Sequence, residues 1–247
     1  CVVLEKANLP ATVSSMGLSP FRGCDIMSEV DFNGSSYFTC KDSVIFELDG
    51  SGSPAKLVEY LSGKRPRIVE PSEVEGITEI YPEAFMGTNV ESVDLTGSKI
   101  PAIPLSTFQD TSALYTVTLP DGCRSIAQDA FSDSAIRLLR IPNSVSVINE
   151  KAFDDTDNDG ATDKSSLTFV CVEDSVAELY AKDNGIQIRY ILPVYTVKFY
   201  DPDLKVVDTQ YIEEGSPFTA PTVESLPENV GYTRLTWTPP SGTIVTS

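Results

Sequence analysis

The 247-residue sequence contains no histidine. A Ser-His-Asp triad, a Cys-His pair and a His-bearing zinc site are therefore excluded from this chain. The sequence also lacks a run of the ~20 apolar residues that a membrane-spanning helix needs, so we expect no membrane insertion by this segment. No phosphate-binding glycine loop and no nucleophile elbow is found, and the sequence predicts a protein that is not an enzyme.

Positive charge is scarce as well. Lys and Arg total 18 against 36 Asp and Glu, which gives a formal net charge of −18. Such a chain repels phosphate backbones and anionic lipid, which argues against binding to nucleic acid or to a membrane surface. The charge is compatible with cationic partners or calcium, and equally with a well-solvated exported surface.

One hexamer pattern, with apolar residues at positions 1, 4 and 6, returns six times. The hexamer starts lie 23, 63, 24, 22 and 31 residues apart, which indicates a unit of 22–24 residues interrupted by insertions of about 40 and about 9. The hexamers are LEKANL from Leu4, MSEVDF from Met27, VESVDL from Val90, LYTVTL from Leu114, IRLLRI from Ile136 and LTFVCV from Leu167. We expect each to form a short strand with one buried face.

Two further rows recur in step with the hexamers. One is apolar and comprises Met16, Ile80, Ile103, Ile126 and Ile148; the other is aromatic and comprises Phe21, Phe85, Phe108, Phe131 and Phe153. Because each unit can bury its apolar stripe only against a neighbouring unit, these rows predict a solenoid of stacked coils with short parallel strands. The roughly helical spacing before each Phe predicts a short helical or 3-10 segment on the other side of each coil.

The hexamer matches the L-x-x-L-x-L core of leucine-rich repeats. The segments LPATVSSMGLSPFRGC (9–24) and IPNSVSVINEKAF (141–153) resemble the BspA-like, Treponema pallidum-type repeats of bacterial surface proteins. The resemblance implies a leucine-rich-repeat solenoid domain over residues 1–190. It also implies a monomeric, exported cell-surface protein that adheres to a host or bacterial surface protein or to a glycan. The alternative is a structural spacer or stalk without a ligand of its own.

Two segments interrupt or end the array. Residues 33–68 contain two alternating apolar stretches around DGSGSP, which predicts a β-hairpin insertion that decorates the solenoid. Residues 174–184 show helical spacing at Val176, Leu179 and Tyr180, followed by a stop at Gly185. This pattern predicts a helix that caps the last coil.

Residues 191–247 predict a small all-β domain. Its expected strands are YTVKFY (195–200), VVDTQYI (206–212) and GYTRLTW (231–237), with Trp237 in the core. The succession of YTVKF, EEG, GY and Trp resembles the Listeria–Bacteroides repeat, also called the InlB B-type repeat. That resemblance implies a stalk or spacer module.

The acidic insertion DDTDNDGATDKSS spans residues 154–166. Alternate carboxylates with a glycine turn suit calcium, and the segment follows the spacing of an EF-hand-like loop. The ligands at loop positions 1, 3, 5, 7 and 9 would be Asp155, Asp157, Asp159, the Ala161 carbonyl and Asp163. Ser166 stands where the bidentate Glu is usual, and the alternative is an acidic solvated loop. Calcium is the one cofactor that the sequence suggests.

The outward strand positions change along the array from acidic to aromatic and basic. We expect Tyr115, Arg137, Arg140 and Phe169 to form a contact patch for a ligand, because aromatic and Arg side chains dominate binding hot spots. Cys171 is expected on the same outward side. The alternative is an ordinary solvated sheet surface.

Overall fold

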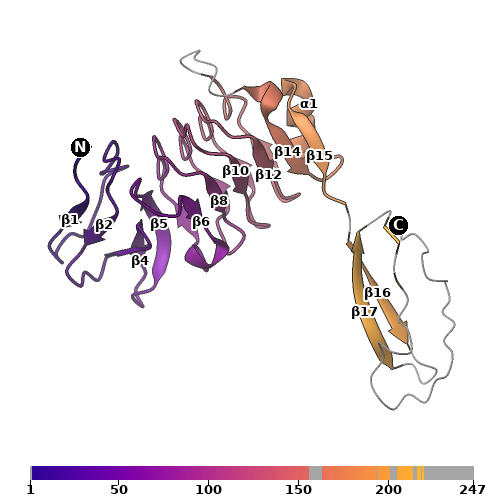
Figure 1. The fold of residues 1–247 in the computed structure, drawn as a ribbon, viewed down its shortest axis with the longest axis horizontal. Helices are drawn as coiled ribbons and strands as arrows, with labels where there is room; N and C mark the ends of the chain where they lie inside the picture. Colours follow the sequence, from indigo (N-terminus) through magenta and orange to yellow (C-terminus); the bar gives the residue numbers. More distant parts are fainter. Residues whose placement is uncertain are drawn as a thin grey trace. The chain divides into compact units, whose positions relative to one another are not determined.

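The computed structural model describes residues 2–155, 163–192, 194–200, 205–213, 216–217 and 219. The chain divides into two compact units, Cys1–Tyr190 and Ile191–Ser247. The first unit is a solenoid of stacked coils whose strands follow one another in sequence order (Figure 1). Its short strands pair in parallel from coil to coil, so the fold class predicted from the repeats is confirmed.

The main sheet of the solenoid has six parallel strands in the order β15-β14-β12-β10-β8-β6. Their bounds are β6 Ile68–Val69, β8 Ser92–Asp94, β10 Thr116–Thr118, β12 Leu138–Arg140, β14 Thr168–Cys171 and β15 Gln187–Tyr190. One residue of each strand enters the core, and in four adjacent strands this inward row is at most 1% exposed: Val93, Val117, Leu139 and Phe169. The residues on either side of the row therefore face outward.

The last hexamer lies one residue away from the predicted register. Phe169, and not Val170, pairs with Leu139. Phe169 and Cys171 are consequently 0% exposed, and the prediction that placed both on the outward side is wrong. A one-residue slip reverses every side chain of a strand, and LTFVCV is apolar enough to accept either register.

The other side of each coil carries a second parallel sheet, β13-β11-β9, with bounds Val147–Ile148, Ser125–Ile126 and Ala102–Ile103. The expected helical segments before each Phe are absent from the described coils, where 3-10 helix is restricted to η1, Pro71–Glu73, and η2, Lys164–Ser166. The chain enters the aromatic turn through residues with positive φ, namely Glu83, Ser106 and Asp129. That left-handed backbone breaks a helix before it can form.

The aromatic row forms a stack of rings through the core. Successive centroids lie 4.8 Å apart for Phe85 and Phe108, 5.0 Å for Phe108 and Phe131, and 5.0 Å for Phe131 and Phe153. Tyr60 extends the stack, with its ring 5.6 Å from that of Phe85. A residue of the predicted insertion therefore occupies an aromatic position of the repeat.

The insertion forms three antiparallel strands, β3 Phe38–Lys41, β4 Val44–Leu48 and β5 Pro54–Tyr60, which we call the wall. Its last strand also pairs in parallel with β7, Glu79–Ile80, of the following coil. The predicted end at residue 68 is too late, because Ile68 belongs to β6 in the main sheet. The wall is thus continuous with the solenoid.

Both faces of the wall are buried. Val44, Phe46, Leu57 and Tyr60 pack in the main core, whereas Phe38, Ile45, Val58 and Leu61 pack in a second core with the N-terminal coils. Those coils contain the parallel pair β1, Lys6–Asn8, and β2, Glu29–Asp31. The prediction that the insertion is a decoration is wrong, because it separates and supports two hydrophobic cores.

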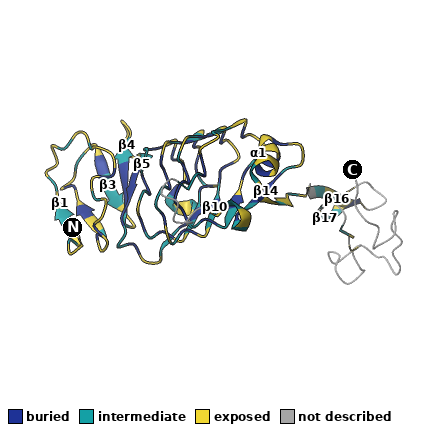
Figure 2. Ribbon diagram, turned by 90° about the horizontal axis from the view of Figure 1, so that it is seen from above, coloured by how far each residue is buried: buried dark blue, intermediate teal, exposed yellow. Residues whose placement is uncertain are grey.

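The helix α1, Val176–Asn184, lies against the last coils. Ser175 caps its first turn, and Gly185 ends it in the left-handed conformation. The buried side consists of Ala177, Glu178 and Ala181, so the inner side of the ribbon is dark blue and the outer side yellow in Figure 2. Of the three residues whose spacing predicts the helix, Tyr180 packs against the core, whereas Val176 and Leu179 are 36% and 58% exposed. The small Ala side chains allow a close approach to the sheet that Leu179 would prevent.

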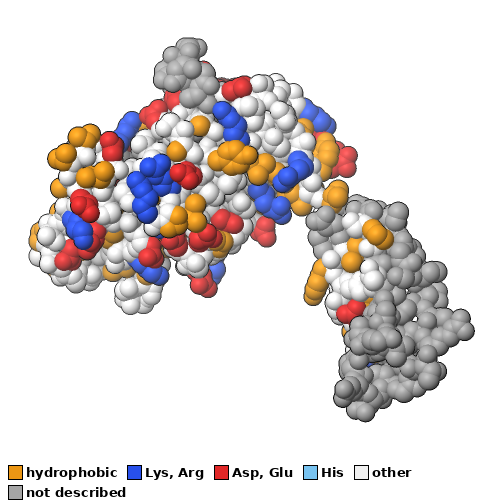
Figure 3. Space-filling model, viewed as in Figure 1, with side chains coloured by type: hydrophobic (Ala, Val, Ile, Leu, Met, Phe, Trp, Pro, Cys, Tyr) orange, Lys and Arg blue, Asp and Glu red, His pale blue; other side chains and the backbone are white. Residues whose placement is uncertain are grey.

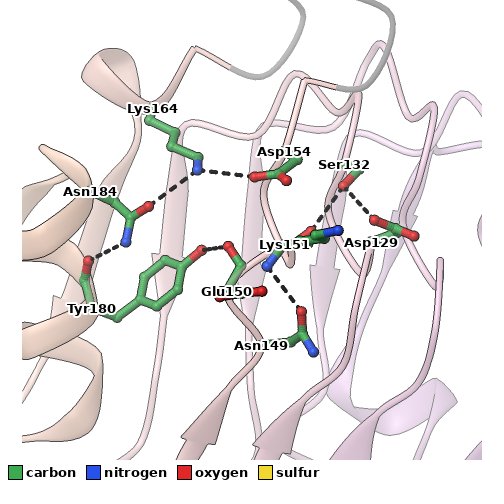
Figure 4. A network of polar contacts seen from close by, with 9 residues as sticks. All are labelled: Asp129, Ser132, Asn149, Glu150, Lys151, Asp154, Lys164, Tyr180 and Asn184. Carbon is green, nitrogen blue, oxygen red and sulfur yellow. Dashed lines mark hydrogen bonds and ion pairs between the residues drawn. The ribbon is translucent and has the colours of Figure 1, made fainter.

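Polar contacts tie α1 to the preceding coils (Figure 4). The Tyr180 hydroxyl donates a hydrogen bond of 3.2 Å to the backbone carbonyl of Glu150. Lys164 Nζ lies 3.3 Å from Asp154 Oδ1 and 3.2 Å from Asn184 Oδ1. These bonds span the second insertion and join its two ends to the helix.

The second unit contains an antiparallel pair, β16 Val194–Tyr200 and β17 Val206–Glu213. The expected strand at 231–237 and Trp237 lie outside the described residues. Across the residues that the structure describes, none of the helices has the length and hydropathy needed to cross a bilayer.

Candidate functional site

The outward face of the main sheet changes charge from strand to strand. The position after the inward row holds, in spatial order from β6 to β15, Glu70, Asp94, Thr118, Arg140, Val170 and Arg189. Neighbouring positions lie ~4.8 Å apart, the spacing of paired strands. Carboxylates therefore occupy one end of this row and guanidinium groups the other.

Three of the four residues predicted for the contact patch are exposed or partly exposed and belong to two adjacent coils. Tyr115 is 62% exposed, Arg140 is exposed and Arg137 is partly exposed. The Arg137 amide donates a hydrogen bond of 3.0 Å to the Tyr115 carbonyl, so the two residues occupy equivalent places in adjacent coils. Phe169 is not part of the patch, because it lies in the core.

Arg189 joins the patch, and the sequence reasoning missed it. The residue pairs in register with Val170, which in turn pairs with Arg140. The two guanidinium-bearing residues thus stand two strands apart, ~10 Å at the backbone, on either side of Val170, which is 4% exposed. The alternation in IQIRY (186–190) signals a strand, but the segment had been assigned to the end of the cap.

Two arginines of the patch differ in pairing from several bases on or beside other strands. Lys6 pairs with Glu29 at 2.5 Å, Lys56 with Glu47 at 3.0 Å and Arg67 with Glu91 at 3.5 Å. Arg140 and Arg189 make no ion pair within the described part of the chain. Their guanidinium groups are therefore available to an external anion.

Acidic side chains near the patch are few and engaged. Strands β10, β12, β14 and β15 contain no Asp or Glu. The Asp94 carboxylate in β8 accepts hydrogen bonds from the Thr96 amide at 2.9 Å and the Thr96 hydroxyl at 2.7 Å. The positive end of the face thus lacks a neutralising partner on the sheet itself.

Only the two ends of the predicted calcium loop can be placed. Asp155 and Asp163 are described, whereas Asp157, Asp159 and Ala161 lie outside the described residues. The Asp163 carboxylate accepts hydrogen bonds from the Ser165 hydroxyl at 2.6 Å and the Ser165 amide at 2.9 Å, which lower its pKa. The described residues contain no group of three His, Cys, Asp or Glu side chains placed to hold a metal ion. Calcium binding stays a prediction.

A groove of about 480 Å³ lies between β2 and β3. Its lining includes Glu29 and Asp31 on one strand, and Cys40 and Lys41 on the other. Burial raises the pKa of the Cys40 thiol, which makes it a poor nucleophile because the thiolate is the reactive form. The groove therefore offers no evident catalytic group.

The comparisons with known proteins concern the solenoid. Residues 69–158 match the family described as BspA type Leucine rich repeat region, in six copies. A search of curated proteins found no match. Similar solved structures include a leucine rich cell surface protein from Faecalibacterium prausnitzii, with a TM-score of 0.51, 22% identity, and coverage of 72% of this chain and 50% of that one.

The pneumococcal vaccine antigen PcpA is also similar, with a TM-score of 0.50, 16% identity, and coverage of 76% of this chain and 56% of that one. The matched part of this chain therefore spans about half the length of either protein, and at such identities the likeness shows the fold alone. The parallel coils thus form a leucine-rich-repeat solenoid, and its residues 69–158 are similar to repeats of the BspA type.

Proposed function

We propose that this chain is a non-enzymatic binding segment of an exported cell-surface protein, and that the outward face of its main sheet recognises a protein or a glycan. The observation that carries the proposal is the cluster of Tyr115, Arg137 and Arg140 at the two central strands of that sheet, β10 and β12. A similar fold in a leucine rich cell surface protein supports the location. The absence of histidine supports a role without catalysis.

The main sheet is a suitable support for recognition. The row beneath the cluster is packed, with Val117 and Leu139 both 0% exposed, whereas Tyr115 above it is 62% exposed. Side chains on a rigid scaffold lose less conformational entropy on binding than side chains on a mobile loop. Tyr and Arg are also the side chains that most often carry binding energy at interfaces.

The test is binding of the purified chain to arrayed glycans and to immobilised extracellular proteins. A variant with Arg137→Glu and Arg140→Glu should lose specific binding by at least about tenfold, because each reversal replaces attraction by repulsion. Arg124→Glu is the matched control, since Arg124 is exposed but precedes β11 in the second sheet. Binding that survives the double reversal contradicts the proposed surface.

A structural spacer is the second candidate, and the separate β16–β17 unit favours it. The resemblance of residues 191–247 to the Listeria–Bacteroides repeat supports a stalk, which calcium at residues 155–163 would stiffen. Calorimetry with calcium on the unmodified chain and on Asp157→Ala tests the ion: heat in the first and less in the second is expected. If neither sample releases heat, calcium is not part of the proposal. If the chain binds no ligand on any array, the spacer is the favoured function.

A further inference from the structure

We infer that the partner of the main sheet is an anionic polysaccharide, and that Arg140 and Arg189 hold its carboxylate or sulfate groups. The inference rests on the proposed function and specifies the class of its ligand. Its geometric basis is the pair of guanidinium groups on β12 and β15, two strands apart in one outward row. Figure 3 shows Lys and Arg side chains gathered over the β12–β15 end of this sheet.

The two arginines lack the internal partners that neutralise several other basic residues of the solenoid, such as Lys6, Lys56 and Arg67. Arg67 at the opposite end of the sheet is paired with Glu91, whereas Arg140 and Arg189 have no ion pair in the described residues. An Arg guanidinium presents two parallel donors that match a carboxylate or sulfate. Two such groups ~10 Å apart can engage successive anionic groups of one extended chain.

The net charge of −18 does not prevent this contact. At physiological salt the Debye length is ~8 Å, so distant exposed carboxylates are largely screened. Asp94 is the nearest acid in the same row, ~10 Å from Arg140 and ~19 Å from Arg189 at the backbone. Its carboxylate is also turned towards Thr96. Outside the row, Asp163 interacts electrostatically with Arg137, and Glu173 with Tyr190. Within the row itself, no acidic residue stands beside Arg140 or Arg189.

The surrounding side chains favour a glycan over an acidic protein. The face carries hydroxyl and amide groups from Thr116, Thr118, Thr168 and Gln187. Protein interfaces usually have an apolar centre depleted in charge. Here Val170 is only 4% exposed, and the partly exposed Leu138 stands between Thr116 and Thr168. Tyr115 adds an exposed ring on which a sugar can stack. The hydroxyl groups can bind sugar hydroxyls, the guanidinium groups can bind the anionic groups, and the ring can stack on a sugar, so this face suits a charged sugar chain.

The test uses heparin as a sulfated probe, polygalacturonate as a carboxylated probe and dextran as a neutral one, with calorimetry at about 0.15 M salt. The unmodified chain should bind at least one polyanion and not dextran. Arg140→Gln combined with Arg189→Gln should weaken this binding by at least about tenfold, the equivalent of 1.4 kcal/mol. The control Arg124→Gln removes one unpaired charge from another surface and should change the affinity less than about twofold. The circular dichroism spectrum should be the same in all variants, which shows that they are folded.

The inference is overturned if neither polyanion binds. It is also overturned if Arg124→Gln loses as much affinity as Arg140→Gln combined with Arg189→Gln, because this result would indicate non-specific electrostatic attraction. The array experiment separates this failure from failure of the proposed function. If the chain binds a protein or neutral glycan and loses it with Arg137→Glu and Arg140→Glu, the function stands and the polyanion does not. If the arrays give no ligand sensitive to that reversal, the proposed surface itself fails.

Discussion

Glu59 places an ionisable carboxyl group inside the junction between the wall and the first coil. It is 3% exposed, and its two oxygens accept hydrogen bonds of 3.0 and 3.2 Å from the Phe21 amide. Burial raises the pKa of this carboxyl from its ordinary 4.5 to about 7, because the charged form loses its hydration. The protonated form is therefore the one that the fold favours.

The pH dependence of stability follows from that shift. A group whose pKa is higher in the folded state stabilises the fold below its unfolded pKa, and this contribution is lost as pH rises through the folded pKa. We expect the free energy of unfolding to fall by up to about 3 kcal/mol between pH 4.5 and 8. Urea unfolding across this range measures it, and the chain has no histidine to titrate in the same window.

Glu59→Gln should flatten that dependence, because the amide cannot ionise. Glu91→Gln, at an exposed position that pairs with Arg67, serves as the control and should leave the slope unchanged. A slope identical in wild type and Glu59→Gln would show that Glu59 is not the responsible group.

Gly97 lies where two coils come closest. A Cβ added there would be 2.0 Å from the carbonyl oxygen of Pro71 in the preceding coil. We expect Gly97→Ala to destabilise the protein by ~1–3 kcal/mol, because backbone atoms must move apart. Thermal unfolding can compare it with Gly122→Ala, in the turn of the next coil, where no atom lies within 4 Å and the change should stay within ~0.5 kcal/mol. Equal effects of both would exclude the steric cause.

At the scale of elements, the wall explains a continuous apolar run. VIF in β4 cannot alternate between core and solvent, because Val44 and Phe46 enter one core while Ile45 enters the other. A strand buried on both faces reads as an uninterrupted apolar segment. The same run, seen in the sequence alone, indicated only a strand.

Substitutions on opposite faces of β4 should affect different coils. Phe46→Ala should cost ~3–5 kcal/mol and Ile45→Ala ~2–5 kcal/mol, since each leaves a cavity in its own core. Hydrogen exchange should speed up mainly in β6–β10 for Phe46→Ala and mainly in β1 and β2 for Ile45→Ala. Identical exchange patterns would mean that the two cores unfold as one.

The sequence predicted the coils best where each row holds a similar residue. Ile103 and Ile126 recur at the same place in adjacent coils, as do Phe108 and Phe131, and all four are buried. Two positions before them escaped detection. The strand at PRIVEP (66–71) was missed because the hexamer begins and ends with Pro instead of an aliphatic residue, and Tyr60 was missed because it replaces Phe in the aromatic row. Strand pairing, which the pattern does not encode, identifies that strand.

The contact patch was predicted only in part for a related reason. Tyr115, Arg137 and Arg140 belong to hexamers with an unambiguous inward residue, so their exposure could be inferred. Phe169 was misplaced by one residue, and Arg189 was missed because β15 follows a helix and not the usual turn. The spacing of apolar residues no longer predicts which side chains are exposed at the end of the array, where the capping helix replaces the repeat.

For the whole solenoid, two carboxyl groups set opposite limits on stability. Glu178 in α1 has its pKa lowered to about 2, first by Lys182 and then by Tyr190. Its stabilising effect is present above its ordinary pKa and is lost as pH falls from about 4.5 towards 2, whereas that of Glu59 is lost as pH rises towards 7. We expect the highest melting temperature near pH 5. Thermal unfolding between pH 3 and 8 measures it, and a steady rise up to pH 8 would contradict this prediction.

The wall also determines where damage to the solenoid stops. The apolar residues of the first coil, such as Leu4, Val13 and Met16, are only half-buried, so we expect this coil to open more readily than the wall. A protease that enters the frayed coil meets in β4 and β5 a sheet whose other face remains packed against the coils that follow. We expect proteolysis to stop there, so that the strands that carry Arg140 and Arg189 survive the loss of the residues before 33.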